Sequence, residues 1–247
     1  MKKTQQRPQT DPPQHIVDAI HHAWPDGVLD MPVDWDDAPF WEVCPRLKAA
    51  LSHIPRVGIF YEREPEGGSR WDETSNSDED PPDWHEESRS YHLFFVSSMD
   101  ERVKFATDTI EPDEQGIEQQ FEGEGRIGYA VAVSLVALFA MVRLDQMEFL
   151  ESGTQSEPDV EPHIFDRDGR KVDPEDYYRE FAGGEGCALL KTLHSEIVRI
   201  VRACGIAVIS EEDLNRPVPW LRASDGVVLG VADEPIMVRD AFFFRSM

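Results

Sequence analysis

The clearest periodic pattern in the chain is CALLKTLHSEIVRIVRACG, residues 187–205, in which apolar residues recur at helical spacing. The residues that share one face are Leu189, Leu190, Leu193, Ile197, Ile200, Val201 and Cys204. Such a stripe predicts an amphipathic helix packed on a core, and Gly205 is the residue type that most often follows a helix end.

Two shorter helices are expected nearer the N-terminus. HIVDAIHHAWP predicts a helix that ends before Pro25, because the residue preceding a proline is biased away from helical geometry. A second helix begins at Asp36 or Asp37 and runs to about His53. Its apolar side would hold Trp41, Val43, Leu47 and Leu51. Pro45 lies in this window, so a later start with Pro45 in the first turn is an alternative.

Several segments rich in β-branched and aromatic residues predict strands. The first three are 56–64, 90–98 and 101–110, and Met99 with Asp100 allows a tight hairpin between the last two. Further strands are expected at 206–210, 227–231 and 236–244, the last two joined by a turn at 233–235.

The segment IGYAVAVSLVALFAMV, residues 127–142, contains no charged residue. As a helix it would span about 24 Å at about 1.5 Å per residue, short of the roughly 30 Å of a bilayer core. We therefore predict a buried central helix rather than a membrane span.

Together these elements predict an α+β fold. Its mainly antiparallel sheet would carry the buried central helix and the second amphipathic helix, the latter packed on one face. Residues 15–247 are expected to form a single domain, preceded by a disordered tail at residues 1–14. The domain would include an acidic loop at about 65–89, and loops of this length are usually functional or disordered.

Charge narrows the classes of partner. The chain has 24 Lys and Arg against 49 Asp and Glu, a net charge of −25. Residues 30–186 hold 38 acids and 14 bases, whereas residues 187–247 are nearly neutral. Such a field repels nucleic acid and anionic membranes, and a basic protein partner, cations or simple solubility fit it better.

Cysteine usage indicates a reducing compartment. The three cysteines are Cys44, Cys187 and Cys204, with no CxxC pair among them. This pattern argues against a disulfide framework and against a cysteine zinc site. With no apolar leader at its start, the chain is expected to be cytoplasmic.

Four short patterns resemble chemical motifs, and each has a simpler structural explanation. GEGRIG (123–128) matches a dinucleotide-binding loop, but polar residues precede it where a buried strand is required. Incomplete ligand patterns for calcium occur at Asp166, Asp168, Gly169 and Glu175, and for zinc at His15, Asp18 and His22. Cys187 begins a predicted helix, but His194 is too far along that helix to be its base, and His92 would reach it only through the fold. We therefore predict no cofactor, no metal and no catalytic residue.

The densest acidic stretch is WDETSNSDEDPPDWHEE, residues 71–87, with tryptophans near both ends. The predicted partner-binding residues are Trp71, Asp72, Glu73, Asp78, Glu79, Asp80, Asp83, Trp84, Glu86 and Glu87. Arginine side chains pair with carboxylates and stack on indole rings, so a basic surface fits this composition. The alternative is that the tryptophans only pin a long loop to the body.

Three hypotheses about function remain. The first is a non-enzymatic acidic binding protein, such as an immunity-type inhibitor of a basic toxin or nuclease, or a nucleic-acid mimic. The second is a small enzyme with a site assembled from scattered residues, among which Cys187, Glu62 and Asp108 are candidates. The third is a scaffold subunit of a larger assembly.

Overall fold

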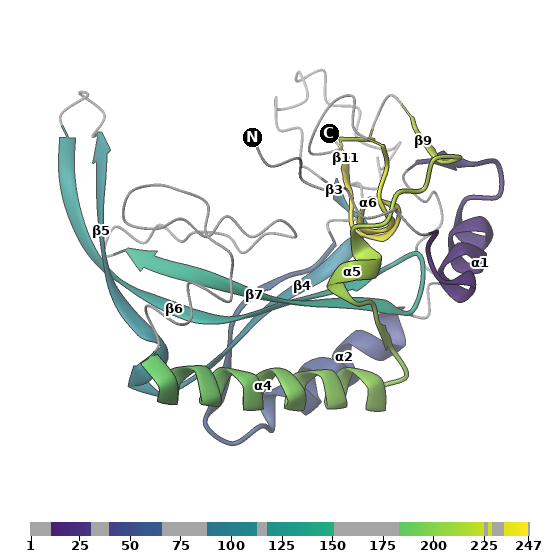
Figure 1. Ribbon diagram of the computed structural model, residues 1–247. Helices are drawn as coiled ribbons and strands as arrows, with labels where there is room; N and C mark the ends of the chain where they lie inside the picture. The colour runs from purple at the N-terminus through teal and green to yellow at the C-terminus, as the bar shows by residue number, and fades with distance from the viewer. Residues whose placement is uncertain are drawn as a thin grey trace, which may run out of the picture.

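The computed structural model describes residues 11–30, 40–65, 88–112, 118–150, 183–224, 227–228 and 235–246. These residues are organised around a six-stranded sheet with the order β2-β4-β6-β7-β8, in which β5 also pairs with β6 (Figure 1). Its strands are β2 (Val57–Arg63), β4 (Tyr91–Ser98), β5 (Lys104–Pro112), β6 (Glu118–Ser134), β7 (Phe139–Leu150) and β8 (Ala207–Val208). All pairs are antiparallel except β7 with β8. The predicted α+β class is confirmed.

The long strand β6 organises the sheet. Along one edge it pairs first with β5 and then with β4, and along the other edge it pairs with β7. The predicted hairpin between 90–98 and 101–110 is therefore wrong, because β4 and β5 follow one another along the same edge of β6. Between them, Asp100 accepts the backbone N–H of Arg102 and caps the 3-10 helix η1 (Glu101–Val103), which turns the chain aside.

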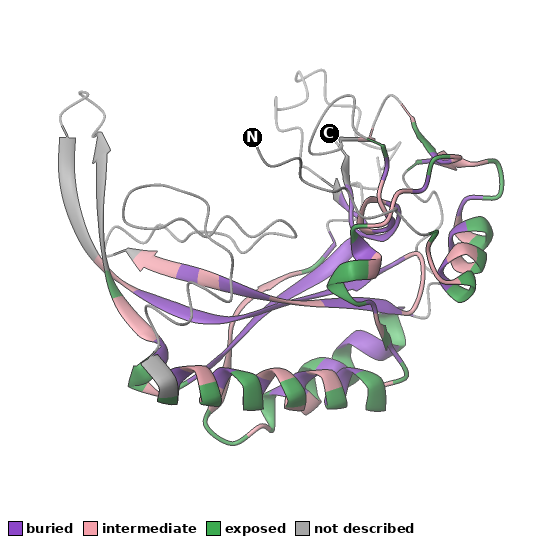
Figure 2. Cartoon of the chain, viewed as in Figure 1, coloured by how far each residue is buried: buried purple, intermediate pink, exposed green. Residues whose placement is uncertain are grey.

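The predicted central helix at 127–142 is also wrong. These residues form the end of β6, a turn and the start of β7, with Val131 opposite Val142 and Val133 opposite Ala140. The segment lacks charge because both faces of the sheet are covered here, and Figure 2 shows these strands buried in the middle of the molecule. No helix in the described ranges is long and apolar enough to cross a membrane.

Two helices, α2 (Phe40–Ser52) and α4 (Gly183–Ala203), cover one face of the sheet (Figure 1). The predicted amphipathic helix is confirmed in α4, and Gly205 follows it with a φ of +86°. Helix α2 begins earlier than the alternative with Pro45 in the first turn, and Pro45 lies inside it. The shared core includes Val43, Leu47, Leu51, Phe94, Val131, Leu193 and Ile197.

The opposite face is covered at one end by short elements from the beginning and the end of the described chain, together with β3 from its middle. The helices are α1 (Gln14–Ala23), α5 (Glu211–Leu214) and α6 (Val238–Phe242). The strands are β1 (Val28–Leu29), β3 (Ser88–Arg89), β9 (Arg222–Ala223), β10 (Val227–Val228) and β11 (Arg245–Ser246). They form a second core with Tyr91, Leu93 and Met141 of the sheet.

The C-terminal part of this region differs from the sequence prediction. The strand predicted at 236–244 is largely the helix α6, because Asp240 accepts the backbone N–H of Met237 at 2.7 Å and closes the first turn. The predicted helix ending before Pro25 is confirmed by α1.

Candidate functional site

The predicted partner-binding residues, from Trp71 to Glu87, lie outside the described residues, as do the calcium-loop residues between 166 and 175. The prediction that they bind a basic partner therefore stays a prediction. What the structure describes is the framework that carries these segments. Residues 66–87 leave after β2 and return at β3, and residues 151–182 leave after β7 and return at α4.

The framework is close to charge balance. Its described residues contain 22 acids and 16 bases, so they account for −6 of the net charge of −25. Half of these bases are engaged in ion pairs within the framework. The pairs are Lys48–Glu62, Arg102–Asp100, Lys104–Glu124, Arg126–Glu124, Arg143–Glu211, Arg199–Glu196, Arg216–Asp213 and Arg239–Asp240. The acidic surplus therefore belongs mainly to the segments outside the described ranges.

The GEGRIG segment does not open a helix. It lies within β6, where the absence of a side chain at two of its glycines lets neighbouring groups approach the strand closely. A Cβ at Gly125 would lie 2.1 Å from the Phe105 ring, and a Cβ at Gly128 would lie 2.5 Å from the Val96 carbonyl oxygen. Only glycine permits these approaches without movement, and a strand interior offers no helix N-terminus for a phosphate. The resemblance to a dinucleotide-binding loop is coincidental.

The histidines of α1 are not brought together with further ligands. Asp18 accepts a hydrogen bond from Gln14 at 2.7 Å, and the ring of His15 lies 6.4 Å from that of Phe139. The neighbouring His21 stacks on Trp220 at 3.9 Å. Within the described ranges no group of three potential metal ligands occurs.

The candidate nucleophile Cys187 is likewise not joined to either candidate base. His194 packs beside the ring of Tyr129 at 5.2 Å, and His92 binds Glu62. Asp108 lies on β5 opposite Glu122 of β6, whereas Glu62 lies on β2 opposite Phe94 of β4. The residues proposed for an assembled catalytic site are therefore divided among separate parts of the fold.

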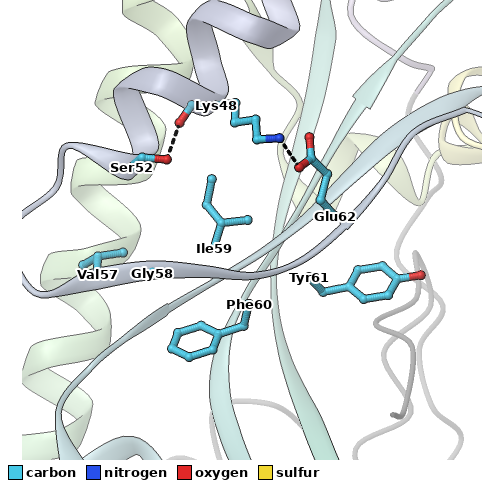
Figure 3. Close-up of a pocket in the computed structure, with 8 residues that line it drawn as sticks. All are labelled: Lys48, Ser52, Val57, Gly58, Ile59, Phe60, Tyr61 and Glu62. Atoms are coloured by element: carbon cyan, nitrogen blue, oxygen red, sulfur yellow. Dashed lines mark hydrogen bonds and ion pairs between the residues drawn. The ribbon is translucent and has the colours of Figure 1, made fainter. Parts of the chain in front are cut away.

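The structure does bring Glu62 and His92 together, along with Lys48 of α2. The Glu62 carboxylate pairs with the Lys48 ammonium, as Figure 3 shows. Its other oxygen lies 3.1 Å from Nε2 of His92, so the carboxylate bridges the two side chains. The imidazole stacks on Phe94 at a centroid distance of 4.3 Å and is nearly buried. This cluster ties α2 to two strands of the sheet.

The electrostatics of this cluster suit a structural role better than a catalytic one. Burial lowers the pKa of His92, opposed by the Glu62 carboxylate, so at neutral pH the imidazole is uncharged and its Nε2–H donates to Glu62. Hydrogen bonding to Glu62 raises the pKa of Lys48, which keeps that side chain protonated.

The groups beside the cluster supply no activated nucleophile. The Ser52 hydroxyl donates to the Lys48 carbonyl at 2.9 Å within α2. Burial, reinforced by Glu62, raises the pKa of the Cys44 thiol to about 12, so the thiolate that would react is not populated at neutral pH. The cluster therefore positions α2 rather than assembling an acid–base–nucleophile set.

Sequence reasoning named Glu62 and His92 separately and missed Lys48. The sequence does indicate that Lys48 of α2 lies near Glu62 of β2. Only four residues separate the helix from the strand, so the helix must pack beside the strand that follows it. The pairing of β2 with β4, which places His92 next to Glu62, depends on sheet register and has no local signal.

The chain matches no protein-family model, and searches of curated proteins and of solved structures gave no significant match.

Proposed function

We propose that this protein is a non-enzymatic acidic binding protein that docks a basic protein partner through carboxylates held on a charge-balanced framework. An immunity-type inhibitor of a basic toxin or nuclease, and a protein that mimics nucleic acid, are two forms of this function. Both present anionic groups to a cationic protein surface.

The observation that carries the proposal is the segregation of charge. Residues 66–87 contain nine acids and one arginine, and residues 151–182 contain ten acids and four bases. The framework holds half of its bases in internal ion pairs and is itself acidic. The two segments together carry nineteen acids against five bases, an excess larger than the eight remaining bases of the framework, which favours neutralisation by an external cationic surface.

The composition of residues 71–87 supports their choice as the main contact. Trp71 and Trp84 stand among carboxylates in this stretch. Arginine is the side chain that both pairs with a carboxylate and stacks on an indole ring. A partner surface rich in arginine is therefore the expected occupant.

The test is retention of basic proteins from a lysate on the immobilised protein at low salt. Exposed ion pairs are screened at about 0.5 M salt, so the retained protein should elute there. A neutralised variant of the 66–87 segment should lose this retention. Its substitutions are Asp72→Asn, Glu73→Gln, Asp78→Asn, Glu79→Gln, Asp80→Asn and Asp83→Asn.

The matched control removes the same number of charges from residues 151–182. Its substitutions are Glu151→Gln, Glu157→Gln, Asp159→Asn, Glu161→Gln, Asp173→Asn and Asp176→Asn. The control should retain the partner with at most a small loss. An equal loss in both variants would mean that retention reflects net charge alone, and no retained basic protein at all would contradict the proposal.

A further inference from the structure

The sheet ends differently at its two edges. Beside β7 the sheet ends in β8, which has two residues, whereas on the other side both β2, with seven residues, and β5, with nine, have a single partner strand among the described residues. Within the described ranges β2 pairs only with β4. Proteins usually protect an edge by making its strand short, by placing lysine or proline on it, or by a β-bulge. The β2 sequence VGIFYER has neither lysine nor proline and carries charge only at its end, and its one irregularity is the register shift between Ile59 and Tyr61.

A hollow of about 420 Å³ follows this open edge. Six consecutive residues of β2, 57–62, line it together with Lys48 and Ser52 of α2. Figure 3 shows Ile59 and Glu62 on the α2 side of the strand and Phe60 and Tyr61 on the other side. Since residues from both sides of β2 line the hollow, it lies against the strand edge, where a further strand would pair.

The residues that flank β2 carry opposite charges. Arg56 precedes the strand by one position and Glu64 follows it by one position. Both are exposed, and neither side chain makes an ion pair or hydrogen bond with the described residues. Arg56 is held at a φ of +60°, with its carbonyl accepting the backbone N–H of Met99 at 2.8 Å.

In one arrangement of two copies, the positive residue that flanks β2 in each copy meets the negative residue that flanks β2 in the other. If two β2 strands pair antiparallel with their Phe60 residues opposite one another, each Arg56 faces Glu64 of the second copy. The two-fold axis repeats the contact at the other end of the pair, so both flanking charges are matched by a single operation. A parallel pairing in register would instead place like charges together, which is unfavourable.

We propose that two copies of this chain associate through their β2 edges, forming a homodimer with one continuous antiparallel sheet. Main-chain hydrogen bonds along the edge supply the association, and the hollow between β2 and α2 receives side chains of the second copy. The contacts of Arg56 and Glu64 fix the register. Because each copy carries a net charge of −25, added salt should strengthen the dimer by screening their repulsion.

The test is sedimentation equilibrium of the full chain at about 0.3 M salt over roughly 1–200 μM, a range that detects a micromolar dissociation constant. The wild-type protein should shift from monomer to dimer. Arg56→Glu and Glu64→Arg should each weaken the dimer roughly tenfold, because each converts two attractive contacts into two repulsive ones. Neither substitution touches the core, and circular dichroism would verify that both variants fold.

Mixing the two variants tests directly whether residues 56 and 64 of different copies face one another. In the mixed pair the carboxylate introduced at position 56 faces the guanidinium introduced at position 64, while the native Glu64 of one variant faces the native Arg56 of the other. The mixture should therefore recover a dimer that neither variant forms well alone. Backbone amides of β2 should also exchange more slowly at high protein concentration in the wild type. A wild-type protein that stays monomeric throughout, or variants that dimerise as it does, or a mixture without recovery, would each overturn the proposal.

Discussion

Gly128 in the middle of β6 should not tolerate even a methyl group. A Cβ at this position would lie 2.5 Å from the Val96 carbonyl oxygen, 2.8 Å from Ser97 Cβ and 2.9 Å from Phe95 Cζ. Overpacking a core costs about 1–3 kcal/mol. The nearest obstacle is backbone on the paired strand β4, which cannot rotate away, so we expect Gly128→Ala to cost about 2–3 kcal/mol of unfolding free energy.

The measurement is urea unfolding, with the loss read from the transition midpoint at an unchanged slope. Gly125→Ala is the informative comparison, because all three nearest atoms to its added Cβ belong to the Phe105 ring, the closest at 2.1 Å. Shortening that ring with Phe105→Leu should reduce the cost of Gly125→Ala and leave the cost of Gly128→Ala unchanged.

If Phe105→Leu reduces the cost of Gly125→Ala but not that of Gly128→Ala, each cost comes from a specific close contact and not from a general intolerance of substitutions in strands. If Gly128→Ala unfolded within about 0.5 kcal/mol of the wild type, as surface substitutions do, the close approach of β4 and β6 would be refuted. The interpretation that the glycines of GEGRIG are required for close packing would then be wrong as well.

Three further outcomes follow from the described residues. The free energy of unfolding should decrease as the pH falls from about 6.5 to 5. Burial lowers the pKa of His92 and of His194 below 6.5, so in this range the unfolded chain takes up protons that the folded chain does not. Urea unfolding measured at each pH should show a weaker dependence of this free energy on pH for His92→Gln than for the wild type. Ser90→Ala should cost about 1–3 kcal/mol in the same assay, because the buried Ser90 hydroxyl accepts the Phe244 N–H at 2.9 Å and its loss leaves that group unpaired. Cys44, whose pKa is raised to about 12, should resist a thiol reagent at pH 8 until urea unfolds the chain, as mass spectrometry of the labelled protein would show.

The sequence predicted elements well where periodicity and end signals agree. The stripe of α4 and the glycine after it located that helix, and the runs of β-branched and aromatic residues located β2 and β4. It failed at 127–142, because a strand covered on both faces is as uniformly apolar as a buried helix. Residues 238–242 include part of an aromatic run typical of strands, but they form a helix because the Asp240 side chain caps its first turn.

The candidate site was less predictable than the fold, for a related reason. Glu62 and His92 were visible as residues, but their contact depends on the register of β2 with β4, which includes a shift between Ile59 and Tyr61. A shift of one residue reverses which side chains share a face, so no count along the chain could place the carboxylate against the imidazole.

The two surfaces proposed for this protein respond to salt in opposite directions, and this follows from where its charge resides. A cationic partner is attracted to the surplus carried by residues 66–87 and 151–182, so screening weakens that complex. A second copy carries the same surplus and is repelled by it, so screening strengthens association at β2. The attraction between Arg56 and Glu64 of a second copy acts only at contact, whereas the net repulsion of −25 on each copy extends over about 10 Å at 0.1 M salt. A basic partner that neutralises the surplus should therefore promote the dimer as well, which makes binding of the partner and pairing of β2 mutually reinforcing.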